Sequence, residues 1–111
     1  MEEMFEIGAF EIQMIADDLI SNVEEPRSKT GHAFRHSVYK KWAGEMIVRF
    51  IFDQLDDGSS DIVLLNDIIY LVEQFRDHMA VYQTYNPKMR EIFSAALSMS
   101  EEFLEVLNCM K

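Results

Sequence analysis

The residues best suited to chemistry lie in one short basic segment. His32 and His36 are four residues apart, so on a helix their imidazoles would share one face. Arg35 and Lys40 lie in the same stretch, and the four residues form a candidate anion or phosphotransfer patch. Two imidazoles at this spacing can also bind a metal ion, but a stable site needs further ligands and no carboxylate lies nearby in sequence. We therefore predict no metal site and no cofactor.

The order of His32, Arg35 and His36 is similar to a segment of the histidine-phosphotransfer domains of phosphorelays. Those domains are small acidic four-helix bundles that expose one histidine, commonly followed three residues later by a lysine and then by a glycine. Arg35 supplies the positive charge at the lysine position, whereas His36 occupies the glycine position. The resemblance covers only these few residues. It implies phosphoryl transfer through His32 as an alternative function.

Charge is distributed unevenly over the 111 residues, whose net charge is -10. Residues 1–25 carry eight acids and no Lys or Arg, whereas residues 26–41 carry five Lys and Arg and no acid. Because an acidic surface repels a phosphate backbone, we expect no direct binding to nucleic acid. An inhibitor that mimics nucleic acid through rows of Asp and Glu is a second alternative function.

The sequence offers no constellation for nucleophilic catalysis. Cys109 is the one cysteine and lies on the polar side of a predicted helix, and no serine occupies a glycine-flanked turn. Gly31 and Gly58 are isolated, so no phosphate-binding loop is predicted. We therefore expect no catalytic residue and no enzyme activity.

Three features predict a cytoplasmic protein. Charges interrupt every hydrophobic segment, so no run approaches the roughly 18 apolar residues of a membrane span. The start, Met1-Glu2-Glu3, is acidic, whereas a secretory signal is basic. The single cysteine cannot form an internal disulfide, which fits a reducing compartment. We expect no membrane partner.

Three turn-rich stretches, at 25–31, 57–60 and 85–87, divide the chain into four segments. Apolar residues recur in each segment at intervals of three and four, as they do along Val38, Trp42 and Met46, which we assign to the core. The pattern predicts helices at about 3–24, 32–56, 60–83 and 87–110 and no sheet. It favours an all-α fold in which residues 1–111 form one domain, a compact antiparallel four-helix bundle.

The first two predicted helices carry more apolar residues than one core stripe requires. On the first, Ile7, Phe10 and Met14 lie nearly opposite the main stripe, and on the second Val48 and Phe52 lie away from it. Such a helix is either central in its bundle or covered by another chain. These five residues are our candidate interface. They favour a non-catalytic protein–protein interaction or regulatory module that binds a protein partner and assembles with itself, as a homodimer.

Overall fold

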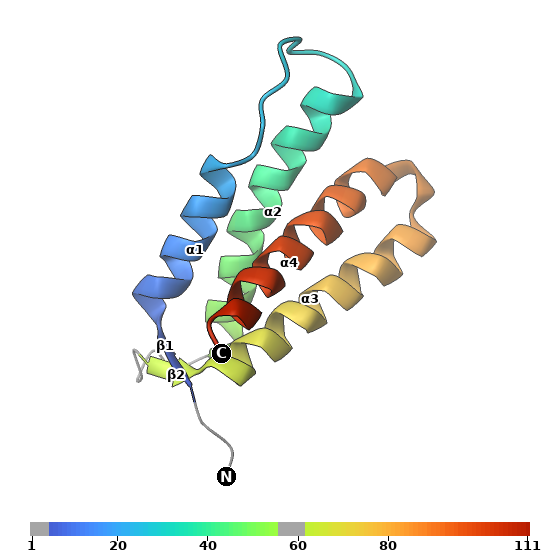
Figure 1. Ribbon diagram of the computed structural model, residues 1–111. Coiled ribbons are helices and arrows are strands. Elements are labelled where there is room, and N and C mark those ends of the chain that lie inside the picture. The colour runs from blue at the N-terminus through green and yellow to red at the C-terminus, as the bar shows by residue number, and fades with distance from the viewer. Residues whose placement is uncertain (1–4, 56–61) are drawn as a thin grey trace.

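The computed structural model describes residues 5–55 and 62–111, in which helices predominate (Figure 1). The helices are α1 (Ala9–Ser21), α2 (His32–Leu55), α3 (Leu65–Tyr85) and α4 (Arg90–Cys109), with the 3-10 turn η1 (Pro87–Met89) directly before α4. Two short strands, β1 (Glu6–Gly8) and β2 (Ile62–Leu64), precede α1 and α3. The predicted all-α class is confirmed. Within the described ranges, no helix is long and apolar enough to cross a membrane.

The two strands correct the expectation that the chain has no sheet. β1 and β2 pair antiparallel with Ile7 opposite Val63, and the backbone N–H of Leu65 donates to the carbonyl oxygen of Phe5 at 2.8 Å. The extended backbone continues to Gly8, so the first helix begins at Ala9 rather than near residue 3. The third helix likewise begins at Leu65, after β2, and not near residue 60. The predicted starts of these two helices, in 1–4 and 56–61, lie outside the described residues.

The core is organised around α4. This helix has its most extensive contacts with α3 and α2 and also touches α1, and Figure 1 shows it between α2 and α3. Met99, Phe103 and Leu107 are spaced at four residues along α4 and are all fully buried. Burial of such a side chain stabilises a fold by about 1.5 to 3 kcal/mol. α4 therefore supplies the main core contacts of α2 and α3.

Small residues bring α1, α2 and α4 close together. Gly44 of α2 is buried, and a Cβ atom at this position would lie 2.7 Å from Ile20 Cγ1 of α1 and 3.6 Å from Met99 Cε of α4. Ala95 and Ala96 of α4 are also fully buried. The distance between helix axes depends on the side chains at the contact, so these positions allow a close approach.

The first helix is the shortest of the four, and this leaves space at one end of the molecule. It ends at Ser21, while α2 extends well past that level and the connecting segment follows it (Figure 1). Gly31 closes the connection with a φ of 91°, a left-handed conformation that favours glycine. Its carbonyl accepts the backbone N–H of Arg35 at 3.1 Å, and α2 begins at His32.

Candidate functional site

The first turns of α2 and α4 meet at one carboxylate. Glu91 of α4 lies with Oε1 2.8 Å from His32 Nδ1. Arg35 donates to the same group twice, from Nε to Oε2 at 2.7 Å and from Nη2 to Oε1 at 2.9 Å. These hydrogen bonds, Arg35 first and His32 second, lower the pKa of Glu91 to about 2. The carboxylate is therefore ionised near neutral pH and balances the charge of Arg35.

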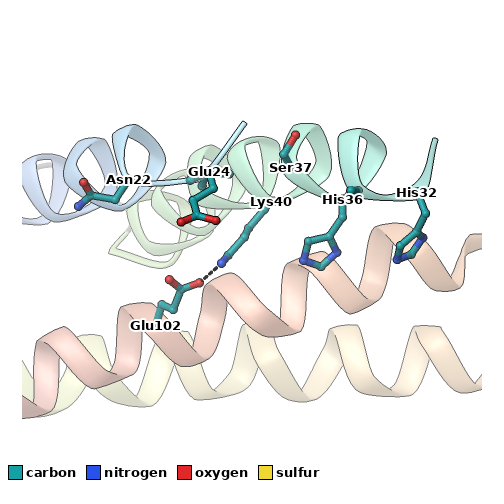
Figure 2. Close-up of a pocket in the computed structure, with 9 residues that line it drawn as sticks. Asn22, Glu24, His32, His36, Ser37, Lys40 and Glu102 are labelled. Carbon is teal, nitrogen blue, oxygen red and sulfur yellow. Dashed lines mark ion pairs between the residues drawn. The ribbon is translucent and has the colours of Figure 1, made fainter. Parts of the chain in front are cut away.

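A polar hollow lies on one side of this junction (Figure 2). Its volume is about 600 Å³, and its lining comes from the segment after α1, from α2 and from α4: Asn22, Val23, Glu24, His32, Ala33, His36, Ser37, Lys40 and Glu102. Figure 2 shows His32, His36 and Lys40 directed to the same side of α2, with Lys40 extended toward Glu102. Lys40 and Glu102 form an ion pair. The hollow occupies the space left beyond the end of α1.

A third ion pair holds the segment at the rim of the hollow. Lys41 donates from Nζ to Glu25 Oε1 at 2.5 Å, and this hydrogen bond is the main reason that the pKa of Glu25 is lowered. With Arg35 and Lys40 already paired, three of the bases in the basic segment face carboxylates. An anion that entered here would compete with those carboxylates for every one of these three positive charges.

The residues of the predicted anion or phosphotransfer patch lie close together in the structure. The charges of Arg35 and Lys40 are balanced there by carboxylates of α4. His32, His36 and Lys40 line the hollow, whereas Arg35 is committed to Glu91. The rings of His32 and His36 lie 6.2 Å apart between centroids. Among the residues that the structure describes, no three His, Cys, Asp or Glu side chains converge as metal ligands. The nearby carboxylate was missed in the sequence because it lies 56 to 59 residues away from its partners.

The five candidate interface residues separate into two groups. Ile7 is 1% exposed and Val48 is 6% exposed, so both belong to the core of this chain. Ile7 lies on a strand, and the helical spacing that joined it to Phe10 and Met14 does not apply there. Phe10, Met14 and Phe52 lie at the surface, with Phe10 the most exposed at 75%.

An apolar groove lies on the other side of the junction between α2 and α4. Its volume is about 360 Å³, and its lining residues are Val38, Tyr39, Trp42, Met89, Ile92 and Phe93. Val38, Trp42 and Met89 are each more than 40% exposed, so the assignment of Val38 and Trp42 to the core is wrong. Their helical periodicity is real, but this face of α2 stays partly exposed. Periodicity identifies an apolar face without showing what covers it.

Aromatic and basic side chains surround this groove. Tyr82 of α3 is 48% exposed and its ring lies 5.9 Å from that of Phe93, which extends the apolar surface toward α3. Lys88 and Arg90 flank Met89 in sequence and are exposed, and Arg35 lies one turn before Tyr39. The groove is therefore an apolar surface with a basic margin on an acidic protein.

Comparison with protein families, with curated proteins and with solved structures finds no match to this chain. We therefore infer a function from the geometry of the polar hollow and of the apolar groove.

Proposed function

We propose that this protein is a non-catalytic protein-binding module, built as a compact antiparallel four-helix bundle, whose apolar groove binds an amphipathic helix of a partner protein. The observation that carries the proposal is the groove itself. Trp42 and Met89 expose much of their surface there, although residues of these types gain most from burial. Exposed apolar patches of this kind mark contact sites.

The composition of the groove favours a protein segment over a small metabolite. Metabolite pockets combine apolar walls with a few convergent polar groups that fix the ligand's orientation. Here the walls are aliphatic and aromatic, and the polar side-chain groups among the lining residues are the Tyr39 hydroxyl and the Trp42 indole N–H. Tryptophan and methionine are enriched at protein interfaces, and methionine adapts its shape to a partner. Two neighbouring helices form the walls, as in the recognition mode in which a groove receives a helix.

The basic residues beside the groove favour a partner helix that carries acidic residues. Lys88 and Arg90 are exposed and flank Met89 of the groove in sequence, whereas the charge of nearby Arg35 is balanced by Glu91. A partner helix with acidic residues next to its apolar anchors would associate faster and in one orientation. The rest of the chain is strongly acidic, so this margin is where such a helix meets least repulsion.

The polar hollow supports the non-catalytic part of the proposal. A phosphotransfer role through His32 would need a basic neighbour available to the phosphoryl group, and Arg35 is instead held by Glu91 in two hydrogen bonds. Lys40 is likewise paired with Glu102. Neither base is free to hold a transferred group without first releasing its carboxylate.

A library of displayed helical peptides tests the proposal without knowledge of the natural partner. We expect the native protein to select peptides with apolar residues at i and i+4 and acidic residues beside them. These peptides should bind Val38→Glu at least tenfold more weakly, while Tyr70→Glu, which alters an aromatic residue 59% exposed on α3, should bind them as well as the native protein does. Selection of no peptide, or equal binding to Val38→Glu, would overturn the proposed function.

A further inference from the structure

We infer that the groove receives the outward face of α1 from a second copy of this chain, so that copies join through two different surfaces. This inference rests on the proposed function, because it names the partner helix. The two surfaces are called here the groove (Val38, Tyr39, Trp42, Met89, Ile92 and Phe93) and the α1 face (Phe10, Met14, Asp17 and Asp18).

The α1 face has the anchor spacing that a helix-binding groove requires. Phe10 and Met14 are four residues apart and share one side of α1, where they are 75% and 48% exposed. The opposite side of the helix is buried through Ile12 and Ala16. A helix that is already folded and docked loses little conformational freedom when its outer side chains bind, which favours association.

The charges of the two surfaces are complementary. Asp17 and Asp18 follow Met14 by about one turn and are exposed, and Glu11 lies in the first turn of the same helix. Residues 1–25 contain no Lys or Arg. The margin of the groove has the exposed bases Lys88 and Arg90. An acidic helix with apolar anchors therefore faces a basic margin around an apolar groove.

The position of the two surfaces excludes a contact within one copy. Phe10 lies at the start of α1, beside the strands, whereas the groove lies along the first half of α2 and the start of α4 (Figure 1). In Figure 1 the start of α1 lies at the opposite end of the molecule from the starts of α2 and α4. Two copies joined in this way leave one α1 face and one groove free. The assembly is therefore heterologous and grows into a ring or an open chain rather than stopping at a symmetric dimer.

Two variants, each defective in one surface, test this arrangement. Phe10→Glu removes the main anchor of the α1 face, and Val38→Glu places a charge in the groove. Both positions are exposed, and circular dichroism verifies that the variants keep the native helix content. Tyr70→Glu is the matched control, because it also replaces an exposed apolar side chain with a carboxylate. Molar mass is measured by analytical ultracentrifugation over a range of concentrations.

We expect the native protein and Tyr70→Glu to form species larger than a dimer as concentration rises, and each of the other variants to stay monomeric. An equimolar mixture of Phe10→Glu and Val38→Glu should form a dimer and nothing larger, because the intact groove of one binds the intact α1 face of the other. A symmetric contact between two α1 faces would instead let Val38→Glu dimerise alone, because that variant keeps its α1 face, and adding Phe10→Glu would form no further dimer.

Three results would overturn the inference: a native protein that is monomeric throughout, a mixture that forms no dimer, or a Val38→Glu variant that assembles as the native protein does. None of these bears on whether displayed peptides bind the groove, so the proposed function is judged separately.

Added salt should also weaken the assembly, since the acidic and basic margins attract each other across an exposed interface. Association that is unchanged or stronger in salt would contradict the charge complementarity.

Discussion

Gly44 is the position where a single added carbon should reveal how closely α1 packs on α2. In Gly44→Ala the new Cβ atom would lie 2.7 Å from Ile20 Cγ1 and 3.0 Å from Ile20 Cδ1, closer than carbon atoms approach without strain. Alanine gains about 1 kcal/mol over glycine in a helix interior. Overpacking costs about 1 to 3 kcal/mol, so Gly44→Ala should lower the free energy of unfolding by about 1 kcal/mol.

A double-mutant cycle with Ile20→Ala separates the clash from helix propensity. Ile20→Ala removes the two atoms that lie within 3.0 Å of the new Cβ, so it should be less destabilising in the Gly44→Ala background than in the native protein, by about 1 kcal/mol or more. The free energies come from urea unfolding followed by circular dichroism. Additive effects within about 0.5 kcal/mol, or a Gly44→Ala protein more stable than the native one, would refute the proposed contact.

Two further predictions concern the pairing of α2 with α4 and the core. The pKa of Glu91 is about 2 in the folded chain, against an ordinary value of 4.5, so its contribution to stability is present above about pH 4.5 and is lost as the pH falls toward 2. The difference in unfolding free energy between the native protein and Glu91→Gln should shrink over that range, and a constant difference in urea titrations at a series of pH values would contradict this. Phe103 is fully buried, so Phe103→Ala should destabilise by about 3 to 5 kcal/mol, whereas Tyr85→Ala, at a position 78% exposed, should change stability by less than about 0.5 kcal/mol in the same assay.

The long helices could be predicted from the sequence because their apolar spacing persists over many turns. The second was expected at 32–56 and is observed at His32–Leu55, and the fourth was expected at 87–110, where η1 and α4 span Pro87–Cys109. The strand at Glu6–Gly8 could not be predicted in this way. Three residues are too few to show a period of two, and its partner lies far away in sequence, at Ile62–Leu64.

The candidate site could be predicted only in part, for a similar reason. The shared face of His32 and His36 follows from local helical geometry and is observed. The carboxylates that pair with Arg35 and Lys40 come from α4, and their identity depends on how that helix packs against α2. The groove combines residues of α2 with residues around the start of α4, and the exposure of Trp42 depends on how these elements pack. Tertiary packing decides each of these points.

The central position of α4 has a consequence for how the protein is made. Ribosomes synthesise a chain from its N-terminus, so α1, α2 and α3 emerge before the helix that supplies Met99, Phe103 and Leu107 to the core. During that interval, the apolar sides of α2 and α3 that pack on α4 have no partner. Nascent chains with exposed surfaces of this kind are prone to aggregate and are bound by chaperones. The core contacts of α4 can therefore form only after α1, α2 and α3 have been synthesised.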